Sequence, residues 1–175
     1  DVVGTSEAET LVGDDEDNNI EALGGDDTVA GGLGDDLILG GDGDDVLRGD
    51  RNARSTQDGE LGGNDIIFGG EGNDRIGGKA GNDILSGDAG GSDLFVFGNG
   101  DGTDTILDFE VGIDRIGLVE GELLFTDLTL TQDGANTLLG VTSSGETLAI
   151  LNNVQASALT ESSFAVVADV SNPEE

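Results

Sequence analysis

A repeat of nine residues constrains the fold of this chain more than any other feature. Nine units fit the pattern GGxGxDxUx in full or in part, where U is a large aliphatic residue, and residues 31–39 and 40–48 fit in full without a gap. A fixed period of this kind is typical of a solenoid, in which successive units stack on one another. The units begin at Gly4, Gly13, Ala22, Gly31, Gly40, Gly49, Gly69, Gly78 and Gly87.

Two columns stay in phase along the repeat. The sixth position is Asp in seven units, and it reads Glu9, Asn18, Asp27, Asp36, Asp45, Asp65, Asp74, Asp83 and Asp93. The eighth position is always apolar, and it reads Leu11, Ile20, Val29, Ile38, Leu47, Ile67, Ile76, Leu85 and Phe95. A tract merely rich in glycine and aspartate would not hold both columns together.

The nonapeptide predicts a turn followed by a short strand. Glycines in the first six residues allow positive φ and close backbone approach, and only the middle residue of the last three points inward. Two units then form one coil of about 18 residues. We therefore predict an all-β fold, a right-handed parallel β-roll whose two sheets enclose a thin core of eighth-position side chains.

The stacked acidic side chains of the sixth position are expected to bind cations. Stacked turns lie about 4.8 Å apart, and like charges at that distance repel by about 1–4 kcal/mol per pair. The chain has 38 Asp and Glu against 6 Lys and Arg, a net charge of −32, and neither His nor Cys. This composition excludes Ser-His-Asp triads, Cys nucleophiles and His/Cys zinc sites, and it argues against nucleic acid and anionic membranes as partners. Hard oxygen donors favour Ca²⁺ or Mg²⁺.

Irregular units mark the ends and the middle of the repeat. Glu9 and Asn18 replace Asp in the first two units, so we expect those turns to cap the roll and to bind weakly or not at all. An insertion at about residues 50–60 interrupts the unit that begins at Gly49. An extra residue near Gly91 is expected to displace Asp93 from its column.

The repeat resembles the RTX (repeats-in-toxin, haemolysin-type) calcium-binding β-roll over residues 4–108. The resemblance implies about six to eight Ca²⁺ ions, each between one turn and the turn two units later. The earlier turn would give the carbonyls of positions two and four and its Asp, and the later turn the carbonyls of positions one and three and its Asp. On one edge, the first site would use Leu23, Gly25 and Asp27 with Gly40, Asp42 and Asp45. The second site would use Gly41, Gly43 and Asp45 with Gly69, Glu71 and Asp74. Gly70, Gly72 and Asp93 would belong to the next site. The opposite edge would use Gly32, Gly34 and Asp36 with Asp65, and Leu61, Gly63 and Asp65 with Gly78, Ala80 and Asp83.

Residues 109–175 form a predicted antiparallel cap. The segment from Phe95 to Ile116 resembles the one that closes RTX rolls in serralysin-type secreted proteases, which suggests a last Ca²⁺ site at Asp101, Asp104 and Asp108. Alternating residues predict strands at 128–131, 137–141 and 147–151 with turns at Asp133-Gly134 and Ser144-Gly145. Residues 157–164 suggest one short helix. Residues 164–167, before an acidic tail, are compatible with a type I secretion signal or with an ordinary last strand.

These patterns predict a non-catalytic, secreted calcium-binding module that folds on binding Ca²⁺. The alternative is an adhesin-like or self-associating solenoid in which Ca²⁺ is only a scaffold, because outward aliphatic residues at the seventh position would form an exposed apolar strip. The sequence leaves open whether a parent protein carries a catalytic domain. No apolar run in the chain is long enough to span a membrane. We interpret residues 49–62 as a bulged surface loop and Arg75 and Lys79 as surface charge balance.

Overall fold

The computed structural model describes residues 1–50, 62–88 and 90–170. Twelve strands build the roll: β1 (Val2–Val3), β2 (Thr10–Val12), β3 (Asn19–Gly24), β4 (Thr28–Gly32), β5 (Leu37–Asp42), β6 (Val46–Asp50), β7 (Ile66–Glu71), β8 (Arg75–Gly77), β9 (Ile84–Ser86), β10 (Leu94–Phe97), β11 (Asp104–Ile106) and β12 (Arg115–Val119). The cap adds β13 (Leu128–Asp133), β14 (Asn136–Val141), β15 (Thr147–Leu151) and β16 (Phe164–Val167). Three 3₁₀ turns, η1 (Phe125–Asp127), η2 (Ala156–Ala158) and η3 (Glu161–Ser163), complete the elements.

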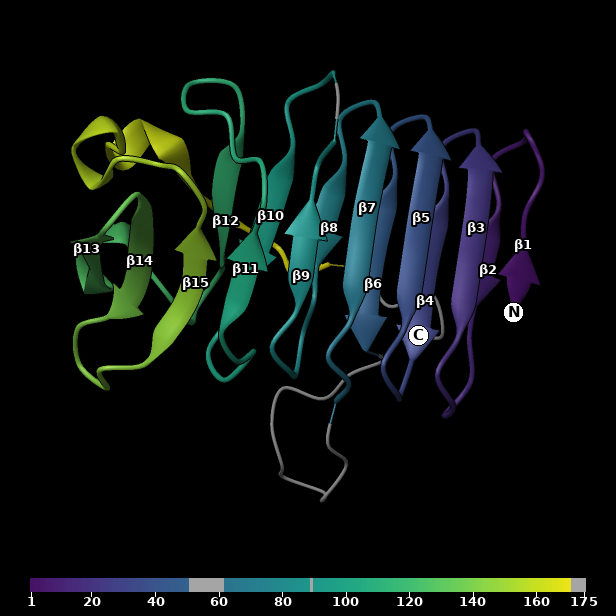
Figure 1. Ribbon diagram of the computed structural model, residues 1–175, viewed down its shortest axis with the longest axis horizontal. Helices are drawn as coiled ribbons and strands as arrows, with labels where there is room; N and C mark the ends of the chain where they lie inside the picture. Colours follow the sequence, from purple (N-terminus) through teal and green to yellow (C-terminus); the bar gives the residue numbers. More distant parts are fainter. Residues whose placement is uncertain (51–61, 89, 171–175) are drawn as a thin grey trace.

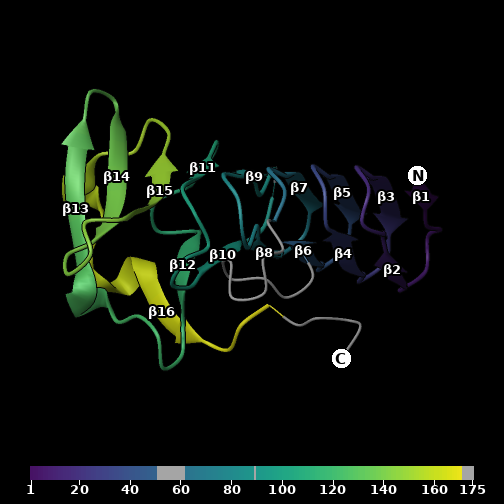
Figure 2. The same cartoon turned by 90° about the horizontal axis from the view of Figure 1, so that it is seen from below.

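Consecutive strands of the roll alternate between two sheets. The first sheet has the order β1-β3-β5-β7-β9-β11-β15-β14-β13, and the second has the order β16-β12-β10-β8-β6-β4-β2. Every pairing between roll strands is parallel, and each strand pairs with the strand two units away. Figure 1 shows the first sheet in front, and Figure 2 shows the two sheets edge-on. The predicted parallel β-roll is confirmed.

The core is the eighth-position column. Eight of its nine side chains are fully buried between the sheets, and Leu11, in the first unit, is partly buried. Each coil adds two such side chains, so the core is continuous but thin, and no single unit could form it alone.

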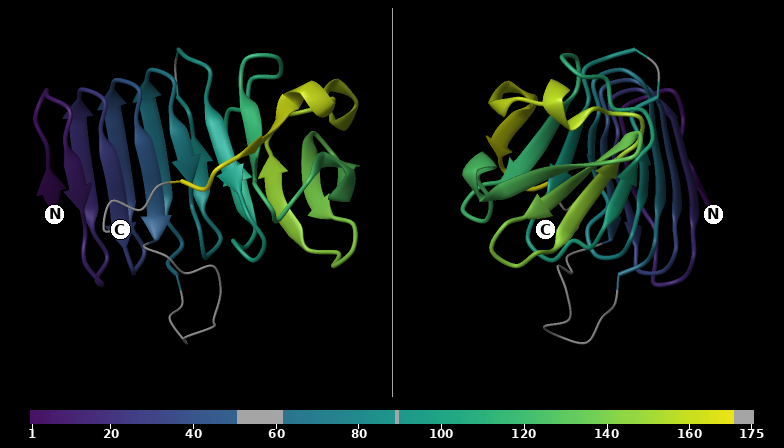
Figure 3. Two further views of the ribbon diagram at one scale, coloured as in Figure 1. Left: turned by 180° about the vertical axis from the view of Figure 1, so that it is seen from behind. Right: turned by 60° about the vertical axis from the view of Figure 1, so that its left-hand side comes forward.

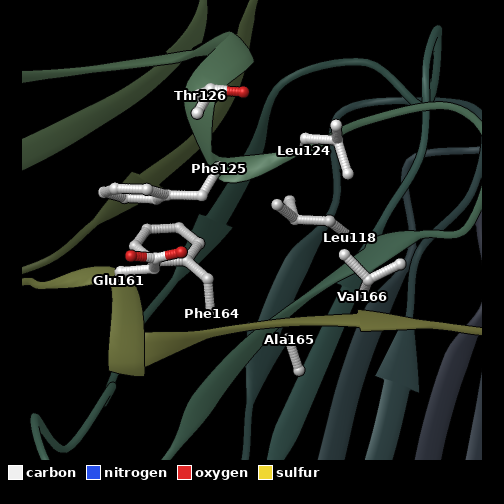
Figure 4. A pocket seen from close by; sticks show the side chains of 8 residues that line it. All are labelled: Leu118, Leu124, Phe125, Thr126, Glu161, Phe164, Ala165 and Val166. Atoms are coloured by element: carbon white, nitrogen blue, oxygen red, sulfur yellow. The ribbon is translucent and has the colours of Figure 1, made fainter.

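The cap closes the core with larger side chains. The strands β13, β14 and β15 form an antiparallel meander, as predicted, and β15 continues the first sheet by pairing in parallel with β11. The rings of Phe125 and Phe164 lie 4.9 Å apart between centroids and help to line an apolar pocket at this end, whose lining has Glu161 as its single ionisable residue (Figure 4). Parallel pairing extends past residue 108 to β12 and β16.

Two sequence-based expectations, one for the cap and one for the roll, are corrected. Residues 157–164 do not form one helix, because Leu159 and Thr160 take extended backbones that separate η2 from η3. Lys79 is not a surface charge, because only 1% of it is exposed. Of the loop predicted at residues 49–62, residues 51–61 lie outside the described residues, and so does the predicted ligand Leu61.

The last described residues leave the cap and return along the roll. Residues 164–167 form the strand β16, and residues 168–170 then run back over the outer face of the second sheet (Figure 3). Among the described residues, no helix is long and apolar enough to cross a membrane.

Candidate metal sites

The sixth-position side chains form a hydrogen-bonded ladder on each edge of the roll. The backbone N–H of each sixth residue donates to Oδ1 of the Asp two units later, as from Asp27 to Asp45 (2.8 Å) and from Asp45 to Asp74 (2.9 Å). One column runs Glu9, Asp27, Asp45, Asp74, Asp93 and Asp114. The other runs Asn18, Asp36, Asp65, Asp83 and Asp104.

The second oxygen of each inner Asp has no partner within the protein. Seven carboxylates that are at most 2% exposed leave Oδ2 buried and without a hydrogen bond. An unpartnered buried carboxylate oxygen is costly, because it has lost water and gained nothing in return. These oxygens are Oδ2 of Asp27, Asp36, Asp45, Asp50, Asp65, Asp74 and Asp83.

Glycine at the first position leaves a cradle beside these oxygens. A Cβ placed on Gly40 would lie 2.5 Å from Oδ2 of Asp45 and 2.4 Å from the carbonyl oxygen of Gly69 in the next turn. A Cβ on Gly49 would likewise lie 2.0 Å from Oδ2 of Asp65 and 2.4 Å from the carbonyl oxygen of Gly78. In each cradle, one carboxylate oxygen and one carbonyl oxygen that the RTX resemblance implied as ligands of the same site therefore face one space.

Carbonyl oxygens of positions two and four also face the next turn. A Cβ on Gly41 would lie 2.2 Å from the oxygen of Leu23, and one on Gly43 would lie 2.2 Å from the oxygen of Gly25. The same holds for Gly70 against Gly41 and for Gly72 against Gly43, at 2.0 and 1.9 Å. Backbone oxygens thus approach so closely that these positions accept no side chain.

Oxygen donors from two turns fit a hard divalent cation. Among the described residues, no three His, Cys, Asp or Glu side chains gather into a metal-binding group of their own. Each candidate site therefore combines two carboxylates with backbone carbonyls, and seven stacked carboxylate pairs are available on the two edges.

Burial shifts the ionisation of the column strongly. Desolvation raises the pKa of Asp36 and Asp45 to about 6 and that of Asp74 to about 7. Desolvation and the charges of Asp83 and Asp50 raise the pKa of Asp65 to about 9. Without a cation, the folded column therefore favours protonated carboxyls, because burial disfavours their charged form.

The first two turns differ from the rest, as the sequence suggested. The side-chain amide of Asn18 donates to Oδ1 of Asp14 (2.9 Å) and to the backbone oxygen of Glu16, which stands at position four of its unit. Glu9 uses Oε2 to accept from the N–H of Thr5. In these two turns, the sixth-position side chain thus already makes hydrogen bonds within its own unit.

The end of the roll departs from expectation in two ways. Asp93 keeps its place in the column despite the extra residue, since it accepts from Asp74 (2.9 Å) and donates to Asp114 (3.0 Å). Asp108 is not brought together with Asp101 and Asp104, although Asp101 lies close enough to Asp104 that, in addition to burial, its charge raises the pKa of Asp104. Asp104 joins the column, whereas Asp108 accepts from Ser86 and from the N–H of Asp88.

Sequence reasoning missed three features of the site. Asp114 ends one column, and the spacing of Asp114 to Ile116, which matches positions six and eight, could have revealed it. Asp50 is fully buried with Oδ2 unpartnered, and no repeat position marked it. An outer ladder links the fifth positions, as where the N–H of Asn73 donates to Asp44 (2.8 Å).

Comparison with known proteins agrees with this geometry. The family model of the RTX calcium-binding nonapeptide repeat (4 copies) matches residues 3–38, 23–53 and 61–94. The repeat region of this chain belongs to that family, and its turns are calcium-binding repeats. No curated protein matches the chain.

Three of the solved structures that match this chain do so at low TM-scores. The extracellular lipase LipA from Serratia marcescens matches at a TM-score of 0.44 and 16% identity, over 94% of this chain and 39% of the lipase chain. The AlgE6R3 and AlgE6R2 subunits of the Azotobacter vinelandii mannuronan C5-epimerase match at TM-scores of 0.38 and 0.35 and at 25% and 24% identity. They cover 86% and 92% of this chain, and 78% and 94% of their own. The site assignment rests on the family match and on the geometry of the chain itself.

Proposed function

We propose that this chain is a non-catalytic extracellular module that folds when it binds several Ca²⁺ ions between stacked turns, after export by type I secretion. The buried carboxylate oxygens without partners are the observation that carries the proposal. Each needs a positive partner if the roll is to form with its carboxylates ionised.

The predicted ligand residues hold the ions in pairs of turns. The ion between the turns of Asp45 and Asp74 takes Oδ2 of Asp45 and the carbonyl of Gly69, which share the cradle at Gly40. Asp45 also contributes to the preceding site, together with Asp27, so neighbouring sites share a ligand residue. Sharing couples the sites, so that one bound ion positions the next turn for another.

The number of ions follows from the stacked pairs. Seven pairs accommodate seven ions, within the six to eight implied by the resemblance. Seven divalent ions add 14 positive charges and bring the net charge from −32 to −18. With two carboxylates per site we expect dissociation constants on the order of 10⁻⁴ M, the range of extracellular modules.

Folding on binding suits a secreted protein. Where Ca²⁺ is scarce, self-repulsion of the −32 chain keeps it extended, as passage through a narrow export channel requires. Outside, abundant Ca²⁺ neutralises the turns and drives folding.

The test is far-UV circular dichroism of the EDTA-stripped chain, titrated with Ca²⁺ and separately with Mg²⁺. A transition from coil to β-structure with Ca²⁺ alone is expected. A chain that is already β-structured in EDTA at neutral pH overturns the folding switch.

A surface-binding function is the second candidate, and one observation favours it. On the outer face of the first sheet, Ile66 and Ile84 are 37% and 39% exposed and lie side by side on β7 and β9. Light scattering of the Ca²⁺-bound protein tests self-association through this strip. A strictly monomeric folded form rules that version out.

A further inference from the structure

Val170, three residues after the end of β16, is packed on the roll rather than left in solvent. Residues 168–170, here called the strap, lie along the outer face of the second sheet (Figure 3). Val170 is 2% exposed and packs with Val96 and Val119 in an apolar cluster separate from the main core. A Cβ on Gly77 would lie 2.6 Å from Cγ2 of Val170, so this glycine makes room for the strap.

Basic side chains hold the strap and the strand before it. All four Lys and Arg residues in the described ranges donate to oxygens of residues 164–170, although the chain is strongly acidic. Arg48 donates to the backbone oxygen of Val170 (2.7 Å), and Arg115 donates to that of Phe164 (2.8 Å). Arg75 donates to the oxygens of Ala168 and Asp169, and Lys79 pairs with the carboxylate of Asp169.

Lys79 replaces a glycine of the repeat, and its side chain reaches the strap. It occupies a second position, where the pattern has glycine, and its φ is +82°. A side chain in this backbone region costs free energy, and such strain persists where the surroundings require it. Here the side chain is fully buried against Asp169, a residue far away in the sequence.

We propose that the strap is a calcium-linked latch, which docks only on the stacked roll and which in turn strengthens calcium binding. The inference rests on the proposed function. The three donors that reach the strap, Arg48, Arg75 and Lys79, come from β6, β8 and the turn after β8, which lie in register only when their coils are stacked. A contact that exists in the folded roll alone must stabilise it, and by linkage it must favour the ions that stabilise the same state.

The latch also controls the C-terminal end of the chain. In the Ca²⁺-free, extended chain, residues 168–170 have no surface to dock on and are accessible. In the Ca²⁺-bound roll Val170 is buried and Asp169 is partly buried. Calcium outside the cell thus converts an accessible Val170 into a buried one.

Thiol labelling tests this directly, because the chain has no Cys. In V170C, a thiol reagent is expected to react roughly tenfold or more slowly in Ca²⁺ than in EDTA, since labelling then requires local opening. V166C is the reference, because Val166 is 51% exposed in the fold. Its labelling rate should differ little between the two conditions.

A matched pair of glycine variants tests the role of Lys79. In a V170C background, K79G restores the repeat pattern and relieves the backbone, yet it should return labelling in Ca²⁺ to a rate close to that in EDTA. N153G is the control, because Asn153 also has a positive φ, of +57°, but is exposed and lies in the cap, outside the proposed metal sites. It should leave the protection of V170C intact.

The outcomes separate the latch from the proposed function. Absence of a circular dichroism change with Ca²⁺ overturns the proposed function itself. A normal folding transition with V170C labelled equally fast in Ca²⁺ and EDTA overturns the latch alone, and so does protection that persists in unfolded, EDTA-treated chain. A chain ending at Val167 should still fold, with its Ca²⁺ midpoint raised roughly two- to fivefold; an unchanged midpoint overturns the linkage.

Discussion

At the scale of the residue, each inner Asp has two separate roles. Its Oδ1 accepts a backbone N–H from the neighbouring coil, and its Oδ2, which is buried without a hydrogen bond, is the oxygen proposed to bind a cation. An Asn at the same place keeps one acceptor oxygen but brings an N–H₂ group to the cation side. Asn18 shows this arrangement, with its amide directed to the oxygens of Asp14 and Glu16.

The variant D45N should therefore weaken two sites at once. Asp45 contributes to the turn of Asp27 and to the turn of Asp74. We expect two fewer ions at saturation in calorimetric titration, or a Ca²⁺ midpoint raised on the order of tenfold. D44N is the matched control, because it removes the same charge from an exposed fifth position outside the cradle. Equal losses in both variants would show that charge alone matters.

The variant N18D should add a site. It replaces an amide that fills its own turn with a carboxylate facing Asp36, and the carbonyl of Gly31 already lies 1.8 Å from where a Cβ on Gly13 would be. One additional Ca²⁺ is expected in equilibrium dialysis. N19D adds the same charge at the adjacent, outward position and should leave the count unchanged. An unchanged count in N18D would mean that the first turns lack more than a carboxylate.

At the scale of the element, the turn depends on what its glycines leave open. Gly40 does not need a positive φ, so its role is the cradle beside Asp45 and Gly69. Gly24, in β3, also has no positive φ, but a Cβ there would make ordinary contacts at 3.6 Å. Comparing Gly40 with Gly24 therefore distinguishes a glycine that leaves space for an ion from a glycine that the repeat could replace with a larger residue.

The variant G40A should accordingly impair calcium binding far more than G24A. The new methyl group would lie 2.4–2.5 Å from two ligand oxygens, and one of them must move. We expect the Ca²⁺ midpoint of folding, followed by circular dichroism, to rise on the order of tenfold in G40A. Little change is expected in G24A. Similar midpoints in the two variants would contradict the position of the cradle.

The sequence predicted the turns and strands because the period is a local signal. Positions six and eight carry both the column of Asp and the core, and the structure places both as expected. The expected displacement of Asp93 was wrong because Asp88 and Gly90 take positive φ and absorb the extra residue within the turn. The strap and the burial of Asp50 were not predictable, because contacts between distant, non-repeating segments leave no period in the sequence.

At the scale of the whole molecule, folding gathers like charges that the extended chain keeps apart. The roll holds two columns of carboxylates, and burial raises their pKa because charged groups lose water there. Calcium and protons are thus alternative ways of neutralising the same columns. With an overall charge of −32, we expect one of them to be needed for a compact fold.

The metal-free chain should therefore be more structured in mild acid than at neutral pH. The pKa is about 6 for Asp36, Asp45 and Asp93 and about 7 for Asp50 and Asp74 in the fold, against an ordinary value of 3.8. A folded pKa above the unfolded one means that the fold binds more protons. Its stabilising effect is complete below about pH 4 and is lost as the pH rises through 6 and 7.

Circular dichroism in EDTA between pH 5 and pH 7.5 measures this effect. We expect β-structure at the acidic end and coil at the neutral end, with Ca²⁺ restoring β-structure at pH 7.5. Light scattering at each pH separates folding from association. A spectrum that stays the same across this range in EDTA would contradict the coupling. Because protons compete for the same oxygens, the Ca²⁺ midpoint should also rise from pH 7.5 to pH 5, as expected when binding must release protons.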